Sequence, residues 1–338
     1  MTITENDTRT GADLGRVQEI GLGFATAKIL LTALELGLFT NLALEGPATA
    51  EEIRVRLGLN GRGVVDLLGA LETFGVLERD GERYRNTPVA DAHLVRGPHY
   101  DAGFLEGANF ALYPAWGGLS AALRTGAPQN IGDFEAMLSD PEGQRRYLAM
   151  MDSLSGPLAP EIASALDWRA HHVLTDVGGA RGNMTSLLLR RFEHLRGVVF
   201  DRPQNAPACA EHTAALGTAG RVEFRGGDFF TDELPETDVL IIGHVLADFS
   251  LEVKKSLVQK AFRAVRPGGA FIVYDPMPDP EQPDIASTVA SLHMLVMSPA
   301  GAGYRPGDCV GWMADAGFDD ISTRKLSMGN SLVVARKR

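Results

Sequence analysis

The stretch Val173-Leu174-Thr175-Asp176-Val177-Gly178-Gly179-Ala180-Arg181-Gly182 joins a short apolar run to an acid and a glycine-rich turn. Residues 183–192 follow with a helical pattern of leucines. A strand, a glycine turn and a helix in this order open the ligand site of doubly wound α/β folds, because glycine lets the backbone pass close to a ligand. Alone the turn is a weak signal, since tight turns without a ligand have the same composition.

The rest of the C-terminal half alternates between strand-like and helical runs. Such alternation with short connections predicts an α/β fold, a mostly parallel, Rossmann-like sheet covered by helices. The predicted strands are 173–177, 197–200, 221–224, 238–242, 270–274 and 331–335, and the predicted helices are 183–192, 206–216, 251–266 and 306–316.

Composition limits the class of protein. The 338 residues suggest more than one domain, and 45% hydrophobic residues allow full cores. The net charge of −11 disfavours nucleic acid and anionic membranes as partners. Two cysteines form no disulfide or metal pattern, which favours the reducing cytoplasm. We expect no membrane span, because no uninterrupted apolar run reaches about 18 residues, and no signal sequence, because Met1–Thr10 is polar.

The N-terminal region, 1–100, is predicted to be a dimerisation domain. We expect residues 1–12 to be disordered and 14–36 to form a helix with apolar residues on more than one face, which a second copy of the chain would cover. Between 48 and 87, Thr49 caps a helix, 62–74 forms a second helix, and Asp80-Gly81 turns a hairpin, the elements of a winged helix. The second helix carries too few basic residues for a DNA reader.

Residues 101–165 are predicted to be a helical region that lines a substrate pocket. Aromatic and methionine side chains there suit a flat organic ligand, although such residues also form plain cores. The candidates for contact with a substrate are Phe110, Tyr113, Trp116, Met150 and Met151. Residues 166–338 would then be the catalytic domain.

Further ligand-binding candidates follow the successive strands of the predicted sheet, where such folds bind ligands. Asp201 follows the second strand, where an acid can accept both hydroxyls of a ribose, and Asp228-Phe229 follow the third. Gly243 ends the fourth strand. The adjacent Gly178 and Gly179 do not match the G-x-G-x-x-G pattern of nicotinamide enzymes and suit a ligand without a pyrophosphate, such as S-adenosylmethionine (SAM).

At this point the chain resembles the plant-type SAM-dependent O-methyltransferases, in their bacterial natural-product branch. The resemblance covers nearly the whole chain and rests on Asp176–Gly182, Phe200-Asp201-Arg202-Pro203, Gly227–Phe230, Arg266-Pro267-Gly268-Gly269, His293-Met294-Leu295 and Ala316-Gly317-Phe318. It implies SAM binding by Asp176, Gly178, Gly179, Gly182, Asp201, Asp228, Phe229, Gly243 and Phe249. It also implies that the helix carrying His293 lines the substrate cavity, which adds Met294 and Met297 to the pocket candidates.

The chain departs from this family where the reaction would occur. The family has His-Asp-Trp after the fourth strand, and its His is the general base. Here the three residues are Ala247-Asp248-Phe249. A methyl group cannot accept a proton, and general-base catalysis contributes about 10²–10⁴-fold. Asp275 matches one acid that supports the family's His, and the second supporting acid falls near Gly303 and is lost.

Three hypotheses follow from the missing base. The enzyme methylates an acidic phenol or a nucleophilic carbon by proximity alone; or another residue takes the proton, with His293, His244 and Asp248 as candidates; or SAM serves a non-methylating reaction such as hydroxylation, decarboxylation or pericyclic chemistry. Some relatives hold iron with the His-Asp pair and a later His. Here only Asp248 and His293 remain of that set, and two protein ligands rarely suffice, so we expect no metal.

The sequence thus predicts a cytoplasmic, homodimeric, SAM-dependent methyltransferase of secondary metabolism, such as antibiotic biosynthesis. Its acceptor would be a small aromatic or polyketide-like intermediate, methylated on oxygen or carbon. The alternative is a non-methylating SAM enzyme of the same metabolism.

Overall fold

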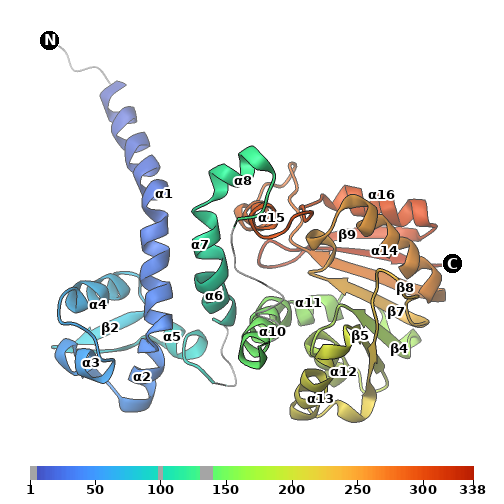
Figure 1. The fold of residues 1–338 in the computed structure, drawn as a ribbon, viewed down its shortest axis with the longest axis horizontal. Coiled ribbons are helices and arrows are strands. Elements are labelled where there is room, and N and C mark those ends of the chain that lie inside the picture. Colours follow the sequence, from blue (N-terminus) through green and yellow to red (C-terminus); the bar gives the residue numbers. More distant parts are fainter. Residues whose placement is uncertain (1–5, 98–101, 130–139) are drawn as a thin grey trace. The chain divides into compact units, whose positions relative to one another are not determined.

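The computed structural model describes residues 6–97, 102–129 and 140–338 (Figure 1). It comprises two compact units, Met1–Asn109 and Phe110–Arg338. Residues 130–139 of the predicted pocket-lining region, and residues 1–5 of the segment expected to be disordered, lie outside the described residues.

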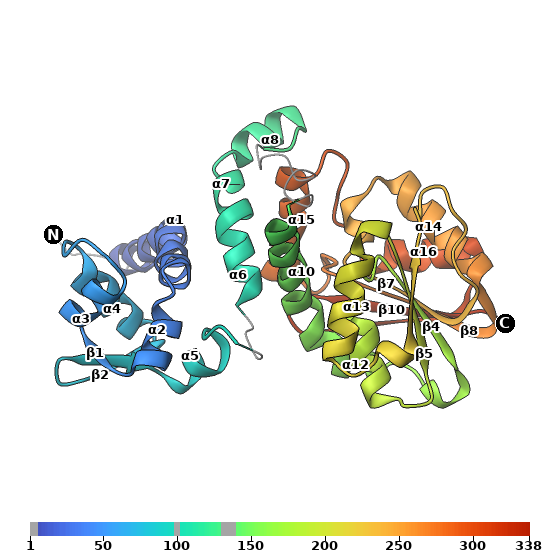
Figure 2. The same cartoon turned by 60° about the horizontal axis from the view of Figure 1, so that its bottom comes forward.

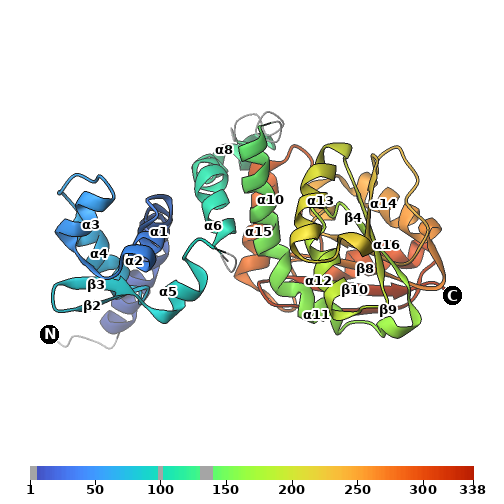
Figure 3. The ribbon, with the colours of Figure 1, turned by 90° about the horizontal axis from the view of Figure 1, so that it is seen from below.

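The N-terminal unit is helical with a small three-stranded antiparallel sheet of order β1-β3-β2, of which Figure 3 shows β2 and β3. Its elements are α1 (Asn6–Glu35), α2 (Leu38–Glu45), β1 (Ala48–Thr49), α3 (Ala50–Arg56), α4 (Val64–Thr73), β2 (Leu77–Asp80), β3 (Arg83–Asn86), α5 (Pro88–His93) and α6 (Gly103–Gly107). The α3 and α4 helices and the β2–β3 hairpin confirm the predicted winged helix. The helix predicted for 14–36 is longer than expected, because α1 begins at Asn6, so the prediction that residues 6–12 are disordered was wrong.

Local chemistry accounts for the start of α3. Thr49 Oγ1 accepts a hydrogen bond from the amide of Glu52 at 3.3 Å, and the Glu52 carboxylate accepts one from the amide of Thr49 at 2.8 Å. This reciprocal pair satisfies two amides that the first helical turn leaves unpaired. The hairpin turns at Gly81, whose φ of 59° is left-handed and favours glycine.

Helix α1 exposes large apolar side chains along its first half. Leu14, Val17, Ile20, Leu22 and Phe24 are between 58% and 68% exposed. The segment Leu14–Glu35, with a mean hydropathy of 1.3, is long and apolar enough to cross a membrane by length and composition. Of its most apolar stretch of 18 residues, 17% is buried. One such helix is weak support for a membrane span, because helices that pack against protein pass the same test.

The C-terminal unit contains a seven-stranded sheet of order β6-β5-β4-β7-β8-β10-β9 (Figure 1). Strands β6, β5, β4, β7 and β8 are parallel to one another. Strand β10 is antiparallel to both β8 and β9. The strands are β4 (Val173–Val177), β5 (Arg196–Asp201), β6 (Val222–Gly226), β7 (Thr237–Gly243), β8 (Val265–Asp275), β9 (Asp319–Lys325) and β10 (Ser331–Arg336). The mostly parallel sheet confirms the predicted fold class, and β9, which is mostly polar, was not predicted.

The helices of this unit, in chain order, are α7 (Tyr113–Trp116), α8 (Leu119–Thr125), α10 (Pro141–Ser155), α11 (Ala159–Ala163), α12 (Asn183–Arg191), α13 (Ala206–Ala215), α14 (Leu251–Ala264), α15 (Ile285–Met297) and α16 (Pro306–Ala316). A π-helix, Ala108–Leu112, precedes α7, and short 3₁₀ turns include η6 (Leu246–Asp248).

Alternating side chains of the strands build two cores. Val239 and Ile241 of β7 face a cluster with Leu158, Ile162 and Trp168, in and around α11, and with Leu188 of α12. Leu240 and Ile242 face the opposite cluster, with Leu257 of α14 and Met313 of α16. This period of two covers both faces of the sheet, as a parallel sheet requires.

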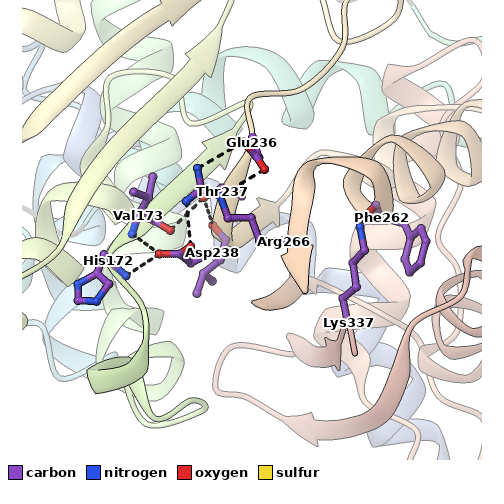
Figure 4. Close-up of polar contacts among 9 residues, drawn as sticks. His172, Val173, Glu236, Thr237, Asp238, Phe262, Arg266 and Lys337 are labelled. Atoms are coloured by element: carbon purple, nitrogen blue, oxygen red, sulfur yellow. Dashed lines mark hydrogen bonds and ion pairs between the residues drawn. The ribbon is translucent and has the colours of Figure 1, made fainter. Parts of the chain in front are cut away.

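A half-buried carboxylate, that of Asp238, aligns the starts of the central strands (Figure 4). Asp238 accepts hydrogen bonds from the amides of His172 at 2.7 Å and Val173 at 2.9 Å, and from Arg266 at 3.0 Å. Burial alone would raise the pKa of Asp238, but these hydrogen bonds bring it below its ordinary value. The network joins β4, β7 and β8 at the edge of the sheet opposite the glycine turn.

Candidate active site

The glycine turn lies between β4 and α12, where the strand order reverses between β5 and β7. Gly178 and Gly182 have left-handed φ values of 74° and 76°. A Cβ on Gly178 would lie 2.7 Å from Val245, and one on Gly179 would lie 2.7 Å from the Asp176 carboxyl carbon. The turn therefore requires glycine for close packing, and its position is the switch point at which such sheets bind ligands.

Asp176 supports this turn from below. Its side chain is 4% exposed and accepts a hydrogen bond from the Thr185 hydroxyl at 2.9 Å. Burial raises its pKa to about 6, Thr185 lowers it, and the negative charge of Asp201 adds to the rise. Asp176, one of the predicted SAM-binding residues, therefore packs against the backbone of the turn at Gly179.

Asp201 ends β5 and is bonded directly to the turn. Its Oδ2 accepts the Ala180 amide at 2.7 Å, and its Oδ1 accepts the Arg202 amide at 2.6 Å and the Asn205 side-chain amide at 2.8 Å. Each carboxylate oxygen has about two lone-pair sites, so Oδ2 can accept one more hydrogen bond from a ligand. The glycine turn and Asp201 therefore lie next to each other, as predicted.

Asp228 and three phenylalanines follow β6 and β7. Asp228 accepts the Phe230 amide at 2.8 Å. The rings of Phe229, Phe230 and Phe249 lie within 4.7–5.6 Å of one another between centroids. Lys260 of α14 donates to the carbonyls of Phe229, Phe230 and Asp232 at 2.8–3.0 Å and fixes this loop. The structure brings Phe229 and Phe249 together as predicted; the sequence analysis missed Lys260.

Gly243 ends β7 where an aromatic ring passes. A Cβ there would lie 1.9 Å from the Tyr274 ring, so packing alone demands glycine. This observation accounts for the residue without a ligand, and a direct role of Gly243 in SAM binding stays a prediction.

Side-chain contacts that were not predicted tie helix α10, which lies beside α12 (Figure 2), to the loops after β4 and β5. Asp152 accepts from Arg181 of the glycine turn at 2.6 Å, and Gln144 donates to Asn205 after β5 at 3.1 Å. Burial raises the pKa of Asp152 to about 6, and Arg181 lowers it. The signal was the arginine inside the turn, because a partly buried guanidinium there needs an acid nearby. The predicted pocket residues Met150 and Met151 lie half-buried on this helix.

Ala247, predicted to stand in place of the family's base, lies in η6 and is 9% exposed. Behind it, Asp275 is fully buried and accepts the Tyr304 hydroxyl at 2.6 Å. Burial raises the pKa of Asp275 to about 7, and the Tyr304 hydrogen bond lowers it. Tyr304 is itself 6% exposed and belongs to the same apolar cluster as Ala247. Asp275, predicted to match a supporting acid of the family, thus pairs with Tyr304.

Asp248 is exposed, yet burial raises its pKa to about 6 while Lys254 lowers it. A carboxyl that is crowded by protein but reached by solvent is expected on the wall of an open recess. Burial is the main cause that raises the pKa of Tyr147 on α10, and the negative charges of Asp248 and Asp201 raise it further. Both carboxylates therefore lie within electrostatic reach of Tyr147.

His244, another candidate for the base, makes its contacts with Asn330 and Tyr274. Its Nε2 lies 2.8 Å from the Asn330 side-chain oxygen, and its ring packs against Tyr274 at 5.1 Å. With Nε2 as the donor to an amide oxygen, the lone pair is on Nδ1, which is buried without a hydrogen-bond partner. This geometry does not favour His244 as a base.

His293 is half-buried on α15, which contacts both α7 and η6. Its Nδ1 lies 2.7 Å from Nε1 of Trp116. Tyr113 and Trp116 are half-buried, Met294 and Met297 pack against apolar clusters, and Phe110 is 66% exposed. The structure therefore brings Trp116 to His293, and Trp116 and Met297 to one apolar cluster, whereas Phe110 belongs to none of the clusters of the described residues.

Among residues 6–97, 102–129 and 140–338, no group of three or more His, Cys, Asp or Glu residues could hold a metal ion. A recess of about 390 Å³ lined by Gly268, Asp319, Asp320 and Arg336–Arg338 lies at the edge of the sheet opposite the glycine turn.

Comparison with known proteins decides the family. A model of the O-methyltransferase domain matches residues 116–319, and a model of the O-methyltransferase dimerisation domain matches residues 18–96. The chain is 42% identical to the tetracenomycin polyketide synthesis 8-O-methyl transferase TcmO of Streptomyces glaucescens, over 96% of each chain. This chain belongs to the O-methyltransferase family. The O-methyltransferase is also 35% identical to the N,N-dimethyltransferase OxyT of Streptomyces rimosus, over 94% of this chain and 95% of that one.

Solved structures of O-methyltransferases share the fold. Human N-acetylserotonin methyltransferase in complex with SAM superposes with a TM-score of 0.87 at 24% identity, covering 100% of this chain and 99% of that one. The mitomycin 7-O-methyltransferase MmcR superposes with a TM-score of 0.85 at 26% identity, covering 98% and 100%. The enzyme is a SAM-dependent methyltransferase with a dimerisation domain, and the glycine turn, Asp201 and the phenylalanines of its structure fit that cofactor.

Proposed function

We propose that this enzyme methylates a phenolic oxygen of a fused-ring aromatic polyketide, without the histidine base of its family. The observation that carries the proposal is the 42% identity over 96% of both chains to a polyketide 8-O-methyl transferase. The half-buried Trp116 and the methionines of α10 and α15 supply apolar surface of the kind that binds flat rings.

The chain's own residues divide the work between two groups. Asp201, Asp228, Phe229 and Phe249 hold SAM, with the turn at Gly178–Gly182 against it and Asp152–Arg181 holding α10 across the turn. When bound, SAM supplies an electrophilic methyl group on a sulfonium sulfur. Ala247 offers no proton acceptor, so the acceptor hydroxyl must be acidic enough to ionise without one, and the protein contributes proximity and orientation.

The reaction is tested by counting products. The purified enzyme is incubated with SAM and a panel of fused-ring phenols, and S-adenosylhomocysteine and methylated product are quantified by mass spectrometry. One equivalent of each, with the methyl group on oxygen, supports the proposal. A methyl group on carbon or nitrogen would contradict methylation of a phenolic oxygen. The test includes nitrogen because one relative is named as an N,N-dimethyltransferase. Conversion without S-adenosylhomocysteine supports the non-methylating alternative, which the alanine at position 247 motivates.

The enzyme is proposed to act as a homodimer in the cytoplasm. Exposed Val17, Ile20 and Phe24 on α1 lie in or next to the segment matched by the dimerisation domain, and a second copy would cover them. The two cysteines are free and buried, as a reducing compartment allows. Light scattering should give a dimer, and Ile20→Glu should shift it towards monomer; a monomeric wild type overturns this part of the proposal.

A further inference from the structure

His293 and Trp116 form a contact between two helices of the C-terminal unit. The indole Nε1 and the imidazole Nδ1 are 2.7 Å apart, and the rings meet edge to face at 5.2 Å with an interplanar angle of 87°. The residues are 177 positions apart in the chain, so tertiary packing of α7 on α15 creates the pair.

The chemistry of the two rings fixes the position of the proton. The indole N–H is a donor only, so Nδ1 of His293 must present its lone pair. A protonated imidazolium would oppose two N–H groups and lose this hydrogen bond, and burial also lowers the pKa of His293 to about 4. His293 is therefore neutral with its proton on Nε2. In that tautomer Nε2–H donates a hydrogen bond and cannot accept a proton from a substrate.

The Nε2 edge of the His293 ring is not hydrogen-bonded by the described residues. His293 is half-buried, and no other hydrogen bond to it occurs within the described parts of the chain. Helix α15 contacts η6, which carries Ala247 and Asp248, so His293 lies on the side of the sheet where the strands end.

We propose that His293 binds the acceptor as a hydrogen-bond donor, through Nε2–H, to the oxygen anion of a phenolate, and that Trp116 is a positioning residue that fixes this tautomer. The inference rests on the proposed function for the identity of the acceptor. A hydrogen bond to the charged form lowers the pKa of a phenol in the site. The acceptor class is thus a phenol whose charge is shared with a neighbouring ring carbonyl, since such phenols ionise without a protein base.

The first test separates a donor from a base. Gln in place of His293 keeps an N–H donor of similar reach but has no basic nitrogen, whereas Ala has neither. His293→Gln should keep kcat/KM within about threefold of wild type, and His293→Ala should lose about 10- to 100-fold, the range for a hydrogen bond to a charged group. Equal losses in both variants overturn the donor role. His172→Gln, an exposed histidine at the opposite edge of the sheet, controls for the exchange itself.

The second test needs no turnover. Nitrogen NMR of histidine-labelled enzyme should show His293 as the Nε2–H tautomer at neutral pH. Trp116→Phe should release the ring into a mixture of tautomers, and Trp312→Phe, a half-buried tryptophan on α16, should leave it unchanged. An Nδ1–H tautomer or an imidazolium in the wild type overturns the assignment.

A binding experiment separates this inference from the proposed function. A hydroxyanthraquinone such as alizarin changes colour on ionisation, so its absorbance reports whether the enzyme binds it as a phenolate. Wild type and His293→Gln should bind the phenolate, and His293→Ala should bind less and without the colour change. If no phenol is methylated but these spectra hold, the proposed reaction fails and the donor role stands. If phenols are methylated and the spectra do not depend on residue 293, the donor role fails alone.

Discussion

The proposed cofactor side, with the glycine turn, Asp201 and Phe229, and the proposed acceptor side, with Trp116, His293 and Asp275, are built in different ways. On the cofactor side, side chains at the ends of adjacent strands bond to one another and to the backbone, as Asp201 does with Ala180. On the acceptor side, side chains from separate helices meet, as Trp116 and His293 do. The first arrangement follows from short motifs, and the second only from the way the helices pack.

The two sides also differ in how they treat charge. Asp201 accepts three hydrogen bonds and can accept more, which suits a ligand with hydroxyl groups. Asp275, the acid kept on the acceptor side, is sealed from solvent and bonded to Tyr304. We infer that the cofactor side preserves the chemistry of the family, whereas the acceptor side has replaced a proton acceptor by apolar packing.

The largest effect is expected from breaking the cofactor side. Asp201→Asn keeps the shape of the side chain and removes its charge, so the affinity for SAM should fall about 100-fold, which corresponds to about 3 kcal/mol, the upper range for hydrogen bonds to a charged group. Titration calorimetry measures the change. Glu223 is an exposed acid on β6, the strand next to that of Asp201, and it pairs with Arg225 of the same strand. Glu223→Gln should leave the affinity for SAM unchanged. If Asp201→Asn binds SAM normally, Asp201 does not hold the cofactor.

The second effect concerns the sealed acid. Because burial raises the pKa of Asp275 to about 7, the folded state binds its proton more tightly than the unfolded state, and the free energy of unfolding falls as the pH rises from about 4 to about 7. Asp275→Asn lacks this penalty. Between about pH 5 and pH 8 the variant should gain about 2–3 kcal/mol relative to wild type, as measured by urea unfolding.

Asp238 provides the matched control, since its pKa is lowered. Its stabilising charge is lost only when the pH falls below its ordinary value, so the difference between Asp238→Asn and wild type should stay constant from about pH 5 to pH 8. A constant difference for Asp275→Asn as well would show that its carboxyl is not protonated in the folded enzyme near neutral pH.

A smaller effect is expected from the tether of α10. Asp152→Asn removes the charge that holds Arg181 and should raise the dissociation constant of SAM about tenfold, because the turn loses a partly buried ion pair that orients it. Hydrogen exchange should increase in α10 and at the start of α12. Asp167→Asn, which breaks an exposed pair with Arg169, should change neither. Unchanged exchange in Asp152→Asn would mean that packing alone holds α10.

The same contrast decides what could be predicted from the sequence. Strand β4 was predicted with its observed bounds, Val173–Val177, and the grouping of the turn, Asp201 and Phe229 followed from the rule that parallel strands end at one edge. Strand β9, Asp-Asp-Ile-Ser-Thr-Arg-Lys, was missed because pairing with β10 stabilises it rather than apolar alternation.

Other contacts had no local signal. The hydrogen bond between Trp116 and His293, and that between Tyr304 and Asp275, join distant segments whose approach depends on tertiary packing. That the family's base is missing at Ala247 stays a prediction, and no local pattern in the sequence indicated the hydrogen bond between Tyr304 and Asp275.

The smallest effect is expected from restoring the base. A working general base contributes about 10²–10⁴-fold, but Ala247→His should raise O-methylation of a weakly acidic phenol by less than about threefold. The imidazole would enter a packed cluster around Ala247, where added volume is costly, and the Asp275 carboxyl that would orient it is already bonded to Tyr304. Ala247→Gln, similar in size without a base, is the control for volume. Adding Tyr304→Phe to Ala247→His frees the carboxyl and should raise the rate further. A gain of a hundredfold in Ala247→His alone would mean that the acceptor side still has room for the base, and that only residue 247 separates this enzyme from the base-dependent mechanism.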